Sequence, residues 1–147
     1  MAAWVGLLRG HAALTRALNA ELLADHGLTL NDYEVLLRLS RAPGRRLRRV
    51  DLAEEVLLTA SGITRLLDGL QASGYVEKAA CASDARVTYA VLTDAGLAKL
   101  RAAAGSHLAG VQGRFEERFS EAELATLADL LGRLDRADAD AESCEPG

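Results

Sequence analysis

The sequence has few aromatic side chains, two cysteines and no long apolar run. Aromatic residues make up 4% of the 147 residues, whereas hydrophobic residues make up 50%. A core with so few rings must be built mainly from leucine, alanine and valine, and a core rich in leucine and alanine favours helices. The length fits one domain that is large enough to bury such a core.

The cysteines and histidines give no pattern of a disulfide or metal site. Cys81 and Cys144 are too few for a disulfide framework and lack the spacing of zinc ligands. His11, His26 and His107 are scattered along the chain without a ligand pattern. No apolar run could span a bilayer, and the N-terminus lacks the charged start and cleavage-like site of a signal peptide. We therefore expect a soluble cytoplasmic protein without a metal.

Enzyme motifs are also missing from the sequence. It has no nucleophile elbow, no phosphate-binding glycine-rich loop and no His-Glu metal helix. Asp51, Glu54 and Glu55 are clustered carboxylates, but a predicted helix start at this position explains them through capping and the helix dipole. We expect no enzymatic activity, no catalytic residue and no cofactor.

The net charge of −4 conceals a basic segment. Residues 31–92 hold nine basic and eight acidic residues, whereas residues 93–147 hold six basic and eleven acidic ones. The local field, and not the total charge, steers a protein toward phosphate. Considered alone, a cluster of arginines in this segment fits a solvated loop as well as it fits a phosphate-binding surface. The cluster consists of Arg38, Arg41, Arg45, Arg46, Arg48 and Arg49.

Two helices are predicted before the arginine cluster. The first, from about Ala2 to Asp25, carries an apolar seam at spacings of three and four and ends at Gly27. The second, Asp32 to Arg41, is apolar nearly all round, so we place it inside the core. Asn31, with Glu34 three residues on, predicts a capping box at its start. The seam of the first helix is Trp4, Leu8, His11, Leu14, Leu18 and Leu22.

A short helix, a turn and a longer helix follow the arginine cluster. The short helix over Leu52–Leu57 is predicted to open with a capping box of Asp51 and Glu54. The longer helix, Thr59–Ser73, has an apolar stripe at i, i+3, i+4 and i+7. The stripe consists of Ile63, Leu66, Leu67 and Leu70. Near the helix start, the opposite face carries two hydroxyls and a guanidinium, from Ser61, Thr64 and Arg65.

This order is typical of a winged helix-turn-helix. The N-terminal end of a recognition helix enters the major groove, where arginine pairs with guanine and hydroxyls contact bases or phosphates. Two predicted strands, Tyr75–Ala79 and Arg86–Leu92, flank a polar tip over Cys81–Ala85 that forms the wing. The predicted DNA-binding residues are Arg49, Thr59, Ser61, Gly62, Thr64, Arg65, Asp84 and Arg86.

Long helices are predicted after the wing. Thr93 opens one that runs to about Phe119, and a capping box of Ser120 and Glu123 opens the last, which frays after Asp135. Each has an apolar face that could fold onto the chain's own core. Helix-turn-helix proteins, however, usually bind two half-sites as symmetric dimers. We therefore expect a mainly α (α+β) fold in which residues 1–30 and 93–147 form a helical dimerisation region around a DNA-binding domain over residues 31–92.

Five segments in order resemble the MarR family of bacterial transcriptional regulators. They are Leu52–Glu54, Ser61–Leu67 with Leu70, Gly74–Val76, Ser83–Arg86 and Leu92–Gly96. Ala85 departs from the family pattern, because many relatives carry another arginine there. The resemblance implies a triangular homodimer on a palindromic operator, with recognition helices in successive major grooves. It also implies that Arg86 enters the minor groove and that Asp84 holds it through a charge-assisted pair.

The resemblance further implies a repressor that releases DNA when a small phenolic or aromatic acid binds. The candidate ligand residues are Trp4, His11, Tyr33 and Arg16. Two alternatives stay open. One is a helical protein-interaction module that uses its winged-helix surface. The other is a redox-sensing regulator in which Arg86 favours the thiolate of Cys81.

Overall fold

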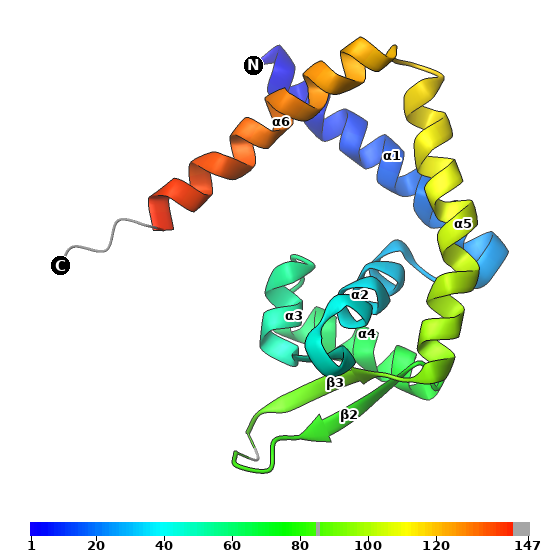
Figure 1. Cartoon of the computed structure of the whole chain (residues 1–147), viewed down its shortest axis with the longest axis vertical. Coiled ribbons are helices and arrows are strands. Elements are labelled where there is room, and N and C mark those ends of the chain that lie inside the picture. Colours follow the sequence, from blue (N-terminus) through cyan, green and yellow to red (C-terminus); the bar gives the residue numbers. More distant parts are fainter. Residues whose placement is uncertain (85, 143–147) are drawn as a thin grey trace. The chain divides into compact units, whose positions relative to one another are not determined.

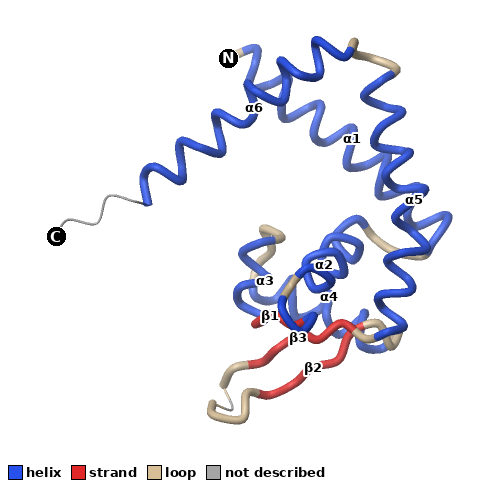
Figure 2. The backbone as a smooth tube through the Cα atoms, in the orientation of Figure 1, coloured by secondary structure: helices blue, strands red, loops and turns tan. Residues whose placement is uncertain are grey.

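The computed structural model describes residues 1–84 and 86–142, which form two compact units. The first unit is Met1–His107, and the second begins at Leu108. Figures 1 and 2 show helices together with one small sheet. In order, the elements are α1 (Ala2–His26), α2 (Leu30–Arg41), the short 3-10 helix η1 (Pro43–Arg45), β1 (Arg46–Arg48), α3 (Arg49–Glu55), α4 (Ala60–Ala72), β2 (Val76–Ala80), β3 (Thr88–Leu92), α5 (Asp94–Glu116) and α6 (Glu121–Glu142).

The sheet belongs to the first unit and has the strand order β1-β3-β2, with both pairings antiparallel. Ala90 of β3 pairs with Leu47 on one side and with Lys78 on the other. Alternate residues of β3 point inward, so Ala90 and Leu92 are buried. The hairpin of β2 and β3 projects from the helices in Figure 2, which is the shape of a wing.

One apolar core holds residues 31–92, called the winged part below, together. Val35, Leu36 and Leu39 of α2 are fully buried, as placing this helix inside the core predicted. Leu52 of α3 and Leu67 of α4 pack into the same cluster. Burying a side chain of this size stabilises a fold by about 1.5–3 kcal/mol. The helix-turn-helix is therefore held by apolar packing on three helices.

The start of α2 corrects one predicted cap. The helix begins at Leu30, and Thr29 is its cap. The Thr29 hydroxyl accepts a hydrogen bond from the Asp32 backbone N–H at 3.0 Å, and Asp32 accepts one from the Thr29 N–H at 2.8 Å. The predicted box of Asn31 and Glu34 is therefore wrong. Both pairs satisfy the same spacing rule, and tertiary packing selects the earlier one.

The start of α3 corrects a second cap. The helix begins at Arg49, before the predicted Leu52, and has no side-chain cap at Arg48. The Asp51 carboxylate instead accepts two hydrogen bonds from the Arg48 guanidinium, each 2.7 Å long. The arginine cluster also contains the strand β1, which the sequence did not predict.

Most other helix ends agree with the sequence. Gly27 ends α1 with a left-handed φ of 64°, and the Thr93 hydroxyl accepts a hydrogen bond from the Gly96 N–H at 3.0 Å. Ser120 and Glu123 form the predicted capping box of α6. This helix continues to Glu142, past Asp135, where the sequence predicted fraying to begin, and Cys144 lies outside the described residues.

Each unit carries exposed apolar side chains. In the first unit several of these are on the N-terminal half of α1, where Trp4 is 56% and Leu8 is 49% exposed, and others include Val50 and Leu57. In the second unit they are on α6, and they include Leu130, Leu131 and Leu134. Among the described residues, no helix has the length and apolar character needed to cross a membrane.

Candidate DNA-binding interface

Helix α4 separates an apolar face from a polar one. Ile63 and Leu67 are buried in the core, whereas Ser61 and Arg65 are exposed. Thr59 caps the helix, because its hydroxyl accepts a hydrogen bond from the Gly62 N–H at 3.1 Å. The hydroxyl and guanidinium groups predicted for a recognition helix therefore lie outside the core and close to the helix start.

Thr64 and Arg49 connect this helix to α3. The Thr64 hydroxyl donates to the Ala60 carbonyl at 2.8 Å and accepts a hydrogen bond from the Arg49 guanidinium at 3.4 Å. Both residues are half-buried. Because Thr64 already uses its one donor and the Ser61 hydroxyl is hydrogen-bonded to that of Thr59 at 3.3 Å, Arg65 is the residue near the start of α4 best able to donate to DNA.

At the tip of the wing, Asp84 and Arg86 are exposed. The Asp84 carboxylate accepts a hydrogen bond from the Arg86 backbone N–H at 3.0 Å. The resemblance implied a pair between this carboxylate and the guanidinium. The structure instead shows a turn in which Asp84 binds the Arg86 backbone. Ala85, where the sequence departs from the family pattern, lies outside the described residues.

Acidic neighbours hold several members of the arginine cluster. Arg38 pairs with Glu34 at 2.8 Å, Arg45 pairs with Asp94 at 2.9 Å, and Arg48 pairs with Asp51. The hydrogen bonds that Arg48 donates to the Asp51 carboxylate raise the pKa of the Arg48 guanidinium. Arginines already paired in this way contribute less positive charge to a DNA surface than the sequence indicates.

Two further basic side chains lie near the interface. The Arg46 guanidinium lies 4.0 Å from the centre of the Tyr89 ring, in a cation–π contact on the outer face of the sheet. Lys78 of β2 forms an ion pair with Asp68 of α4. Sequence reasoning did not select Arg46 or Lys78, because their partners come from other elements.

The candidate ligand residues do not form one site in the described chain. Trp4, His11 and Arg16 are exposed on α1, whereas Tyr33 is 4% exposed within the core. The Tyr33 ring lies 4.4 Å from the ring of His107, and burial raises the pKa of its hydroxyl.

The environment of Cys81 differs from the predicted one. Its sulfur lies 3.1 Å from the Ser83 hydroxyl, and this hydrogen bond is the main cause that lowers the pKa of the thiol. Backbone hydrogen bonds at Ser83 and Asp84 also lower the pKa, while the Asp84 charge raises it. Arg86, which the redox alternative invoked, is not among these causes.

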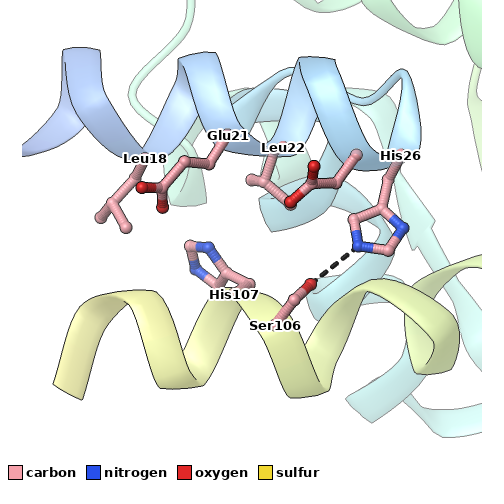
Figure 3. Close-up of a pocket in the computed structure, with 7 residues that line it drawn as sticks. Leu18, Glu21, Leu22, His26, Ser106 and His107 are labelled. Carbon is pink, nitrogen blue, oxygen red and sulfur yellow. Dashed lines mark hydrogen bonds between the residues drawn. The ribbon is translucent and has the colours of Figure 1, made fainter. Parts of the chain in front are cut away.

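Two of the three histidines are closer in space than their scatter in the sequence indicated. His26 at the end of α1 and His107 on α5 line one small cavity (Figure 3). The described residues contain no cluster of three or more metal-ligating side chains suited to a metal ion. Only one feature of the sequence indicated that His107 faces the interior. It lies seven residues after Leu100, and so on the same face of the helix.

A buried helix-turn-helix, an outward polar face on its second helix and a hairpin with an arginine at its tip define a winged helix-turn-helix DNA-binding protein. The family model of the MarR family matches residues 26–87. The chain belongs to this family, whose members are transcriptional regulators and not enzymes.

Solved structures of relatives extend the similarity over nearly the whole chain. AbsC, a MarR family transcriptional regulator from Streptomyces coelicolor, is 32% identical with a TM-score of 0.82, over 95% of this chain and 93% of that one. Sco3205, from the same organism and solved in complex with DNA, is 28% identical with a TM-score of 0.83, over 99% of this chain and 87% of that one. The transcriptional repressor YetL of Bacillus subtilis is 31% identical over 111 residues, which are 76% of this chain and 66% of YetL.

Proposed function

We propose that this regulator binds a palindromic operator as a homodimer, represses transcription and releases DNA when a small aromatic or phenolic acid binds. A regulator of this kind acts in the cytoplasm, where the chromosome lies. The relative Sco3205 was solved with DNA, and the relative YetL is a repressor. These two relatives support the DNA-binding and repressor parts of the proposal.

The observation that carries the proposal is the outward face of α4. Ser61 and Arg65 are exposed one turn apart near the N-terminus of the helix, while the opposite stripe is buried in the core. An arginine in this position can donate two hydrogen bonds to O6 and N7 of guanine. Ser61 can bind a base or a phosphate beside it.

The exposed apolar residues support the dimer. Trp4 and Leu8 on α1, and Leu130 and Leu134 on α6, are each about half exposed or more. Obligate dimer interfaces resemble a hydrophobic core cut in half, and side chains of this type form their centre. A second copy of the chain would place two α4 helices on one duplex, as a palindrome requires.

Arg65→Ala tests the DNA-binding role directly. We expect it to cost about 1–3 kcal/mol of operator binding and to relax base preference at one position in each half-site. Arg101→Ala is the matched control, because Arg101 is an exposed arginine on α5 outside the proposed interface. Binding is measured by fluorescence anisotropy with operator duplexes that carry each base substitution.

Two outcomes would contradict this role. The first is unchanged affinity and unchanged base preference in Arg65→Ala. The second is binding whose strength does not fall as salt is raised, because phosphate contacts release counterions and so depend steeply on salt. The second outcome would favour the alternative of a protein-interaction module.

The effector part of the proposal has its own test. Trp4 is the only tryptophan of the chain and lies on α1 with His11 and Arg16, so its fluorescence reports on that helix. We expect salicylate or a related acid to change Trp4 fluorescence and to weaken operator binding over the same concentration range. A set of such acids that changes neither quantity would remove the effector from the proposal.

A further inference from the structure

A small cavity lies between the C-terminal half of α1 and α5, inside the first compact unit (Figure 3). Its volume of about 20 Å³ suits one water molecule and no aromatic ligand. Leu18 and Leu22 give it an apolar wall. On its rim, the His26 ring and the Ser106 hydroxyl are hydrogen-bonded at 2.7 Å and join the two helices.

His107 is the unusual residue of this cavity. Its ring points from α5 toward α1 in Figure 3 and lies 4.4 Å from the buried ring of Tyr33 on α2. The Nδ1 atom of His107 is buried without a hydrogen-bond partner, the only such side-chain atom found in the described part of the chain. Buried polar atoms normally have a partner, so an exception needs an explanation.

The protonation state of the ring explains this exception. In a neutral imidazole one nitrogen is an acceptor without a hydrogen, and a bare buried acceptor is tolerated better than a buried donor. When His107 takes up a proton, Nδ1 becomes an N–H in a place where no protein atom of the described chain accepts its hydrogen bond. The packed arrangement of α1, α2 and α5 therefore selects the neutral ring.

The charges around the ring come from two helices. Glu21, Asp25 and His26 of α1 line the cavity, and Glu34 of α2 acts on the ring from the other side. Tyr33, also ionisable, contacts the ring directly. On α5, the cavity is lined by Ser106 and by His107 itself. Both Glu21 and Glu34 favour the protonated ring, but the loss of solvent outweighs them and lowers the pKa of His107.

We propose that His107 is a proton-binding site that controls the contact between α1 and α5. When the ring becomes charged, this contact opens, and acidification therefore weakens operator binding. A charged ring needs an acceptor for Nδ1–H. Opening the contact between α1 and α5 admits water, which accepts this hydrogen bond. The contact between α1 and α5 is closed when the His107 ring is neutral.

The direction of the effect follows from linkage. Because the folded-state pKa of His107 is below the ordinary value of 6.5, the unfolded or opened chain binds more protons than the closed one. Stability is therefore full above the ordinary pKa. It falls as the pH drops through 6.5 toward the lowered pKa.

The effect on DNA rests on the proposed function. Helices α1 and α5 flank the winged part in the sequence, and α1 carries the apolar residues proposed for the dimer. A looser contact between α1 and α5 lets the winged part move relative to the half of α1 that binds the second copy. Two recognition helices held at a less defined spacing bind a palindrome more weakly.

The test compares the full-length chain with two variants, His107→Gln and His11→Gln. His107→Gln removes the ionisable ring, and His11→Gln makes the same change at an exposed position of α1. The midpoint of urea unfolding is measured at about pH 8 and about pH 5.5, the range in which histidine titrates. We expect the wild type and His11→Gln to lose more stability on acidification than His107→Gln.

Operator affinity is measured at the same two pH values. We expect the wild type to lose more affinity than His107→Gln over this range, because only the wild type carries the ring whose charged form the closed arrangement disfavours. The comparison between variants cancels the general gain in DNA binding that follows from added positive charge at low pH.

A third measurement needs no variant protein to be stable. The ring protons of the wild type are titrated by NMR, and the His107 signal is expected to titrate below pH 6.5. An ordinary or raised pKa for His107 would overturn the proposal, as would equal pH dependence of stability in wild type and His107→Gln. If no variant binds the operator even at pH 8, the proposed function fails. The titration and the urea data still decide the role of His107.

Discussion

The winged part and the first half of α1 use the same kinds of apolar residue with opposite results. Leu36 and Leu67 of the winged part are fully buried, whereas Trp4 and Leu8 of α1 are about half exposed. Both pairs lie on amphipathic helices. The winged part buries most of its large apolar side chains within one chain, although Val50 and Leu57 stay exposed. The first half of α1 leaves its apolar face uncovered within the first unit.

Helix α1 shows the change along its own length. Leu18 and Leu22 near its end are buried against the first unit, while every residue from Met1 to Ala13 is exposed. The seam itself continues through both halves at the same spacing. Folding of the first unit therefore covers the second half of this helix and leaves the first half exposed.

The strongest test of this comparison is the double variant Trp4→Glu with Leu8→Glu. Two carboxylates on the exposed half of α1 should prevent the chain from dimerising, because burying an unpaired charge costs several kcal/mol. Loss of the second DNA-contacting copy should lower operator affinity by about 10²- to 10⁴-fold. Sedimentation equilibrium gives the mass, and fluorescence anisotropy gives the affinity.

The control for this variant is Ala20→Glu with Ala24→Glu. Both alanines are exposed on the second half of α1 and have the same spacing as Trp4 and Leu8. This control should keep the dimer. A Trp4→Glu, Leu8→Glu protein that still sediments as a dimer would show that the exposed face of α1 has another purpose.

The comparison also marks what the sequence could predict. Periodicity identified the apolar faces of the winged part and of α1, as well as the helix α4 and the hairpin. Each of these depends on residues close together in the chain. Periodicity does not show what covers a seam. The dimer therefore stays a prediction, and so does the division of the chain at residues 30/31 and 92/93.

Features that depend on distant partners were missed. The strand β1 forms inside the arginine cluster because Leu47 pairs with Ala90, more than forty residues away in the chain. The contact of His107 with Tyr33 likewise joins α5 to α2. At α2, two overlapping capping boxes satisfied one spacing rule, and only packing distinguished Thr29 from Asn31.

A second prediction compares packed and open positions along α5. A Cβ atom at Gly96 would lie 2.1 Å from the Tyr75 carbonyl oxygen, which is backbone and cannot move aside cheaply. Gly96→Ala should therefore destabilise the chain by about 3 kcal/mol or more through overpacking. Urea unfolding, monitored by circular dichroism, measures this loss.

Gly105→Ala is the matched control for Gly96→Ala. A Cβ at Gly105 meets nothing within 4 Å, and the position is inside the same helix. Alanine there should stabilise the chain by about 0.5–1 kcal/mol, because glycine is a poor helix former. Equal effects of the two variants would show that the turn between β3 and α5 is less tightly packed than the structure indicates.

The smallest expected effect comes from Arg86→Ala, which should change DNA binding without changing dimerisation. Arg86→Ala should leave the mass in solution unchanged, because Arg86 lies at the tip of the wing and not on an apolar seam. It should weaken binding for all DNA sequences alike and lower the slope of log K against log[salt] by about one per wing. The reason is that Arg86 is exposed at the tip of the wing, where a guanidinium can bind phosphate or enter the minor groove.

Lys78→Met provides the contrast within the same wing. The Lys78 ammonium is already held by Asp68, so removing it should change the salt slope less than removing the Arg86 guanidinium does. An unaltered slope in Arg86→Ala would exclude Arg86 from the DNA interface. A slope that falls equally in both variants would mean that DNA displaces Asp68 from Lys78, and the winged part would then contact the backbone along β2 as well as at its tip.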